Sequence, residues 1–68
     1  MSYEVFKKRV NALVNRMNGA KPVVSFRHDP ERGKHYANFS DGTTIIGNTV
    51  AKNVMVQWGS GHRATAMI

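Results

Sequence analysis

The first part of the chain carries hydrophobic residues at spacings of three and four, the repeat of an amphipathic helix. The residues on this stripe are Tyr3, Phe6, Val10, Leu13 and Met17, with Val14 beside them. Ser2 stands where a helix-capping side chain is favoured, and Gly19 stands where helices often end. The Lys21-Pro22 pair disfavours any continuation. The pattern therefore predicts a helix over residues 3–18.

After residue 22 the hydrophobic period changes to two, which is typical of strands with one buried face. Two strands are expected, over about 23–28 and 34–40, joined by a turn at 29–33 that contains Pro and ends in Gly. In the first strand Val24 and Phe26 share one face and Ser25 and Arg27 the other, and in the second His35, Ala37 and Phe39 share the face assigned to the core. Tyr36 and Asn38 then lie on the opposite face of the second strand.

The Asp41-Gly42 pair is a strong signal for a two-residue hairpin turn. It predicts a third strand over about 43–47. The pairs that follow from such a turn are Ser40 with Thr43, Phe39 with Thr44, and Ala37 with Ile46. This register places Ile46 on the core face.

The segment 49–58 fits two patterns. Val54, Val56 and Trp58 alternate as in a strand, whereas Val50, Val54 and Trp58 have helical spacing. The β-branched residues favour a strand, over about 53–58. After the Gly59-Ser60-Gly61 connector, a last strand is expected over 63–68.

These elements predict an α+β protein with a single small domain over residues 1–68. One N-terminal helix packs on a small antiparallel sheet or barrel of four to five strands. The absence of cysteine excludes disulfides and favours a reducing, cytoplasmic location. No hydrophobic run approaches the length of a membrane span, so no membrane contact is expected.

The charge balance of the chain is strongly basic. Ten Lys and Arg residues oppose four Asp and Glu residues, for a net charge of +6. Glu4 falls in the first helical turn, where it complements the helix dipole. Asp29, Glu31 and Asp41 fall in turns. The acids thus have local structural roles, and the surplus of bases creates a field that attracts polyanions.

The candidate residues for contact with nucleic acid come from the helix, the first hairpin and the last strand. They are Lys7, Lys8, Arg16, Arg27, Arg32, Lys34, Tyr36 and Arg63. Bases bind phosphates and an exposed aromatic ring stacks on a base. The alternative interpretation is that the helix bases are ordinary solvated residues, that Arg32 and Lys34 keep a turn soluble, and that Tyr36 packs at the core edge. Trp58 has the same ambiguity, and a place in the core is favoured for it.

Neither a metal site nor an active site is expected. His28 and His35 can face each other across the first hairpin, but no HExxH motif and no cysteine accompanies the histidines. The serines lack the surroundings of a nucleophile elbow, and the carboxylates lie in turns. The sequence therefore predicts a protein that is not an enzyme and has no cofactor.

The leading hypothesis is binding of DNA or RNA through phosphate contacts, with weak sequence preference. The alternative is a protein-interaction module that docks on an acidic partner surface, as small regulators or inhibitors of phage and mobile elements do. The final strand can leave an open edge for strand addition or homo-oligomer formation.

Overall fold

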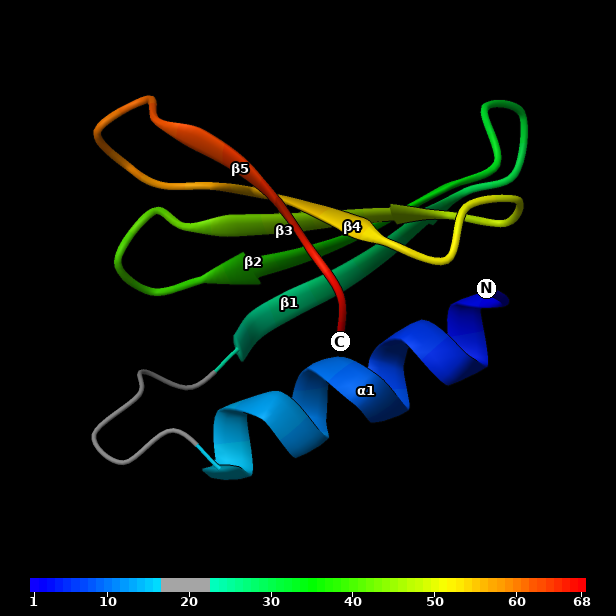
Figure 1. The fold of residues 1–68 in the computed structure, drawn as a ribbon, viewed down its shortest axis with the longest axis horizontal. Helices are drawn as coiled ribbons and strands as arrows, with labels where there is room; N and C mark the ends of the chain where they lie inside the picture. The colour runs from blue at the N-terminus through cyan, green and yellow to red at the C-terminus, as the bar shows by residue number, and fades with distance from the viewer. Residues whose placement is uncertain (17–22) are drawn as a thin grey trace.

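The computed structural model describes residues 1–16 and 23–68 and has one helix followed by five strands (Figure 1). The elements are α1 (Tyr3–Arg16), β1 (Val23–Asp29), β2 (Lys34–Phe39), β3 (Thr44–Asn48), β4 (Val54–Gln57) and β5 (Arg63–Ala66). The strands form one open antiparallel sheet in the order β1-β2-β3-β4-β5. The predicted α+β class is therefore confirmed, with an open sheet of five strands.

The helix begins as the sequence indicates. The backbone N–H of Val5 donates to Ser2 Oγ at 3.3 Å, and that of Phe6 donates to the Ser2 carbonyl at 2.9 Å. The Ser2 side chain therefore satisfies one of the donors that a first turn leaves without partners, and the Ser2 carbonyl accepts the first bond within the helix. The predicted helix is confirmed through Arg16, and the calls on Met17, Gly19 and Lys21-Pro22 lie outside the described residues.

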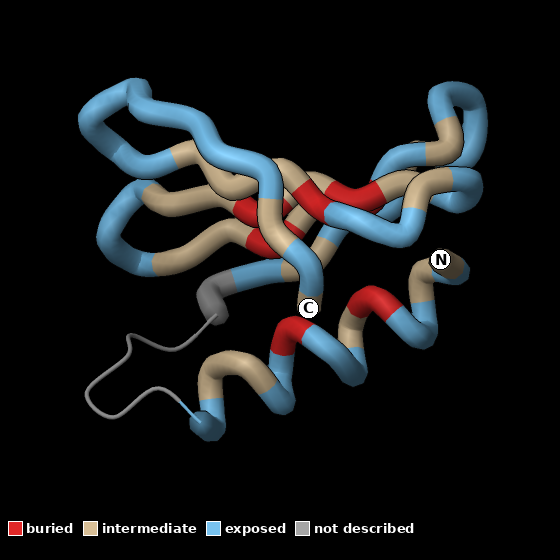
Figure 2. The backbone as a smooth tube through the Cα atoms, viewed as in Figure 1, coloured by how far each residue is buried: buried red, intermediate tan, exposed pale blue. Residues whose placement is uncertain are grey.

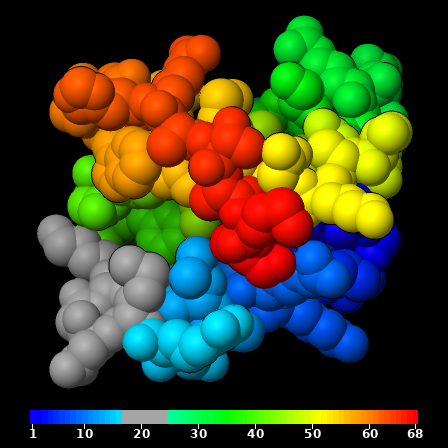
Figure 3. Space-filling view, viewed as in Figure 1, coloured from blue at the N-terminus to red at the C-terminus, as the bar shows by residue number. Residues whose placement is uncertain are grey.

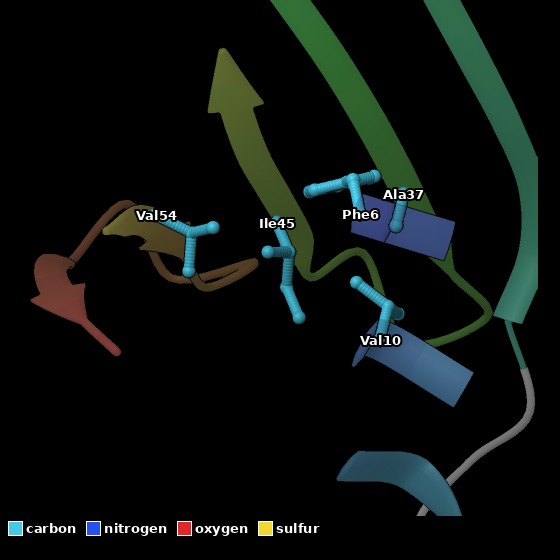
Figure 4. Packing of buried hydrophobic residues seen from close by; sticks show 5 residues of the cluster. All are labelled: Phe6, Val10, Ala37, Ile45 and Val54. Atoms are coloured by element: carbon cyan, nitrogen blue, oxygen red, sulfur yellow. The ribbon is translucent and has the colours of Figure 1, made fainter. Parts of the chain in front are cut away.

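Helix α1 packs on one face of the sheet, called here the inner face (Figure 1). The core consists of Phe6, Val10, Ala37, Ile45 and Val54. They come from the helix and from three neighbouring strands and converge in the space between the two layers (Figure 4). Buried positions accordingly gather where the sheet and the helix face each other (Figure 2). Fully burying a side chain such as Phe6 contributes about 1.5–3 kcal/mol.

The chain after β5 closes the edge of this core. Ala66 and Ile68 pack against the core cluster. Arg9 Nη1 donates to the backbone oxygen of Ile68 at 3.2 Å. In the space-filling view the last residues, coloured red, lie against the blue helix (Figure 3). Strand β5 itself ends at Ala66, so the strand predicted over 63–68 is too long by two residues.

The register of the β2–β3 hairpin differs from the prediction. Phe39 N–H donates to the Thr43 carbonyl at 2.8 Å, and Gly42 N–H donates to the Phe39 carbonyl at 3.2 Å. Gly42 has φ 89°, so the connection is a three-residue loop that ends in a left-handed residue. The extra loop residue makes Ala37 pair with Ile45 and Tyr36 with Ile46. The predicted pairing of Ala37 with Ile46 is wrong, because a shift of one residue moves every side chain to the other face.

The ambiguous segment 49–58 contains a strand, as favoured, but over Val54–Gln57 and so shorter than the predicted 53–58. A three-residue loop follows, in which Trp58 N–H donates to the His62 carbonyl at 2.9 Å and Gly61 N–H to the Trp58 carbonyl at 2.9 Å. This turn lies beside the β2–β3 turn, since a β-carbon on Gly42 would lie 3.5 Å from Gly59 Cα. Trp58 is 43% exposed, so its expected place in the core is wrong.

A histidine pair joins the helix start to the sheet. The Nδ1 atoms of His28 and His35 lie 3.0 Å apart, and His35 Nε2 lies 2.9 Å from the Met1 carbonyl. Tyr3 stacks on His28 with ring centroids 5.0 Å apart. His35 is fully buried, and both ring nitrogens have partners, as a buried polar group requires. The predicted contact of the two histidines across the first hairpin is confirmed.

Candidate nucleic-acid interface

The face of the sheet turned away from α1 is called here the outer face. Its central positions form one cross-strand row to which every strand contributes a residue. The members of this outer row, in strand order, are Arg27, Tyr36, Ile46, Met55 and Thr65. Strand residues alternate between the two faces, so these five side chains project on the side opposite the core. The row places an aromatic and two apolar side chains in the middle of a solvent-facing sheet.

Arg27 and Tyr36 form a pair within this row. The guanidinium carbon of Arg27 lies 4.5 Å from the centroid of the Tyr36 ring. This cation–π contact holds the long Arg27 side chain against the Tyr36 ring. Both groups are planar, and both aromatic rings and guanidinium planes stack on nucleobases. The pair therefore offers a stacking surface together with a positive charge.

Polar residues flank the outer row on both sides. On one side the register aligns Ser25, Asn38, Thr44, Gln57 and Arg63. Thr44 Oγ1 donates to Asn38 Oδ1 at 3.1 Å, which fixes the amide of Asn38. On the other side the register aligns Asp29, Lys34 and Asn48. Hydrogen-bonding side chains and two further cations, Lys34 and Arg63, therefore border the apolar centre.

The Asp29 carboxylate on this face is already engaged. Asp29 Oδ1 accepts from the Arg32 backbone N–H at 3.3 Å, and Asp29 Oδ2 lies 3.8 Å from Arg32 Nε. An ion pair this exposed contributes little to stability. It does offset the charge of Arg32 in the turn, while Arg27, Lys34 and Arg63 keep the outer face positive.

A depression of about 170 Å³ lies within the outer face. Its lining includes Lys34, Ile46, Asn48, Asn53, Met55 and Thr65. Ile46, Met55 and Thr65 belong to the outer row, and the other three residues add amide and ammonium groups beside the Thr65 hydroxyl. The depression is open to solvent on one side and is called here the outer-face depression.

The predicted helix bases lie apart from this surface, because α1 covers the inner face. Lys7 Nζ lies 3.1 Å from Glu4 Oε1 and 4.6 Å from the Tyr3 ring centroid. Lys8 and Arg16 are exposed on the helix. The structure thus places Arg27, Lys34, Tyr36 and Arg63 on one face of the sheet, with Arg27 and Arg63 on its two opposite edge strands. It separates these residues from Lys7, Lys8 and Arg16.

Sequence reasoning missed the apolar, amide and hydroxyl members of the interface: Ile46, Asn48, Asn53, Met55 and Thr65. A two-residue loop at Asp41-Gly42 predicts that Ile46 faces the core, and the observed three-residue loop turns it to the outer face instead. Met55 had a usable signal, since it alternates with Val54 and Val56 and must face away from them.

A second hollow, of about 540 Å³, lies on the helix side of the molecule and is called here the apolar groove. It is lined by Met1, Val5, Arg9, Val50, Lys52 and Met67. Val50 is 92% exposed and Met67 is 77% exposed. A patch of neighbouring apolar side chains that are exposed to solvent is typical of surfaces that contact another molecule.

Within residues 1–16 and 23–68, no three His, Asp or Glu side chains are placed to hold a metal ion. Of the part of the chain that the structure describes, no helix combines the length and apolar character needed to cross a membrane. No known protein family matches the chain, and neither curated proteins nor solved structures give a significant match.

Proposed function

We propose that this protein binds single-stranded nucleic acid, DNA or RNA, on the outer face of its sheet and that it catalyses no reaction. The observation that carries the proposal is the outer row, in which an Arg-capped Tyr adjoins two apolar side chains on an uncovered sheet face. An aromatic on a sheet surface, bordered by cations, is a recurring platform for unpaired bases.

The roles follow from the chemistry of each group. Bases stack on Tyr36 and on the guanidinium of Arg27, and they rest on Ile46 and Met55. Phosphates contact Arg27, Lys34 and Arg63, which stand at the border of the apolar centre. Phosphate contacts supply most of the affinity and carry no sequence information, so overall sequence preference is weak. A broad sheet face favours a single strand over a duplex, whose bases are stacked inside.

Fluorescence anisotropy with labelled oligonucleotides of about 15 residues, begun at about 50 mM salt, tests the proposal. Three phosphate contacts to a single strand predict a slope of log K against log salt of about −2. Arg27→Ala should weaken binding and lower the steepness of this slope by about 0.7. Arg16→Ala removes the same charge from the helix and serves as the matched control.

Absence of binding to both DNA and RNA single strands at about 50 mM salt would overturn the proposal. Equal losses from Arg27→Ala and Arg16→Ala would also overturn it, because they would mean that net charge, and not the outer face, determines affinity. A cytoplasmic location, favoured by the absence of cysteine, is part of the same proposal.

The apolar groove favours a second candidate function, contact with an acidic protein partner. Val5, Val50 and Met67 line it, and Arg9 and Lys52 give it positive charge. This combination fits a partner segment that carries leucine-like residues between carboxylates. Methyl NMR during titration with a peptide of alternating Leu and Asp should move the Val50 and Met67 signals, and Lys52→Glu should abolish the shifts. Unmoved methyl signals would exclude this second function.

A further inference from the structure

We propose that the outer-face depression is a subsite for one pyrimidine base with two carbonyl groups, uracil or thymine. This inference rests on the proposed binding of single strands and adds a base preference at one position. Its basis is the size of the depression and the hydrogen-bonding state of the side chains around it.

The size fits one six-membered ring. The depression measures about 170 Å³, and an apolar cavity of about 150 Å³ accommodates a benzene ring. Ile46 and Met55 supply an apolar surface for the face of a base. The sulfur of Met55 adds a polarizable contact to an aromatic ring. Lys34, Asn48, Asn53 and Thr65 are then left for the polar edge of the base.

Asn48 presents a donor to this site. Its Oδ1 accepts from the backbone N–H of Val50 at 2.9 Å and from that of Ala51 at 2.6 Å. Backbone N–H groups only donate, so the atom that they contact must be the oxygen. The amide of Asn48 is thereby fixed in orientation, and its Nδ2 carries two hydrogens for other partners. Lys34 likewise offers donors and no acceptor.

Because Asn48 and Lys34 offer hydrogen-bond donors, the depression favours a base that carries hydrogen-bond acceptors on its edge. Uracil and thymine carry two carbonyl oxygens on one ring, which match the Asn48 amide and the Lys34 ammonium. Their single N–H can donate to the Thr65 hydroxyl or to the Asn53 amide, both of which accept. Cytosine has the same ring but carries an amino group in place of one carbonyl. This amino group is a donor and would face the donor of Asn48 or Lys34, so one hydrogen bond would be lost. One lost hydrogen bond corresponds to about a fivefold loss of affinity.

The test compares oligothymidine with oligocytidine of equal length, because both are single-ring homopolymers with the same backbone charge. We expect the protein to bind oligothymidine about fivefold more tightly. Asn48→Asp keeps an oxygen for the Val50 and Ala51 N–H groups and replaces the donor by an acceptor, so it should remove this preference.

Asn38→Asp is the matched control. It makes the same chemical change on the same face, outside the depression, and keeps an oxygen for the Thr44 hydroxyl. It should weaken binding of both homopolymers equally and preserve the preference for oligothymidine. In the unaltered protein, the side-chain N–H signals of Asn48 should shift in NMR spectra on addition of oligothymidine.

Equal affinity of the unaltered protein for the two homopolymers would overturn this inference and leave the proposed function standing. A thymidine preference that survives Asn48→Asp, or that leaves the Asn48 signals unmoved, would overturn the assignment of the depression. Failure to bind either homopolymer at about 50 mM salt would instead overturn the proposed function, and this inference with it.

Discussion

The ring of Phe6 lies over the backbone of Gly47 and fills the space that a side chain there would need. A β-carbon on Gly47 would lie 2.7 Å from Phe6 Cδ1 and 2.9 Å from Phe6 Cε1, closer than real carbon atoms approach. Phe6 is fully buried and also contacts Phe26 edge to face, at a centroid distance of 6.4 Å. Because Gly47 has no side chain, the helix can approach the sheet closely at this position of β3.

Gly47→Ala should destabilise the protein by about 1–3 kcal/mol, because the added methyl group overpacks a filled core. Urea unfolding measures the change in the free energy of unfolding. Phe6→Leu relieves the clash, so the double variant should lose less than the sum of the two single losses. Strict additivity of the losses would contradict the proposed contact.

Gly42→Ala should cost about 1–2 kcal/mol, because Gly42 has φ 89° and a β-carbon is disfavoured in the left-handed region. The nearest atom to such a carbon is 3.5 Å away, an ordinary contact, so the cost is conformational and not steric. Gly42→Asn should cost less, since Asn tolerates this region. Thermal unfolding of both variants checks the order, and equal losses would contradict the explanation.

The contacts of His28 and His35 predict which ring nitrogen of each histidine carries the hydrogen. The Met1 carbonyl only accepts, so His35 must carry its hydrogen on Nε2. With both rings neutral, His35 Nδ1 then accepts and His28 must carry its hydrogen on Nδ1. Nitrogen-15 NMR should therefore find opposite tautomers in His28 and His35, with exposed His62 as the internal reference. The same tautomer in both rings would contradict the contact.

Tyr36→Ala should weaken single-strand binding by about 5- to 150-fold, since stacking of one base contributes about 1–3 kcal/mol. Tyr36→Phe keeps the ring and should retain most of the affinity. Trp58→Ala deletes an exposed aromatic outside the outer row. Continuing the alternation of β4, the Trp58 side chain falls on the same side as Val54 and Val56. This substitution should change affinity less than twofold. Fluorescence anisotropy measures the affinity of all three variants. A loss of more than twofold from Trp58→Ala would mean that the binding surface includes Trp58 and not only the outer row.

The sequence was sufficient for the elements whose periodicity is unambiguous. The spacing of Phe6 and Val10 predicted the helix, and the alternation of His35 and Ala37 predicted the core face of β2. The register of β3 could not be obtained in this way. Asp41-Gly42 fits both a two-residue turn and the last two positions of a three-residue loop, and only the longer loop buries Ile45.

The candidate interface was predictable only in part, for a related reason. Arg27 and Tyr36 were recognisable as outward-facing neighbours from the first hairpin alone. Their association with Met55 and Thr65 depends on the order of all five strands, which local patterns do not determine. The separation of Arg16 from Arg27 depends on which face of the sheet the helix covers, and this is a property of the packed core.

The strand order has a kinetic consequence. Each strand pairs with the next one along the chain, so every pairing in the sheet closes only a short loop. Contacts of larger sequence separation are made by the helix, as between Phe6 and Gly47, and by the chain ends. The Met1 amino group, for example, donates to the carbonyls of Asn48 and Ala51, each at 3.0 Å. Because local contacts favour rapid folding, successive hairpins should form early and the helix should dock last.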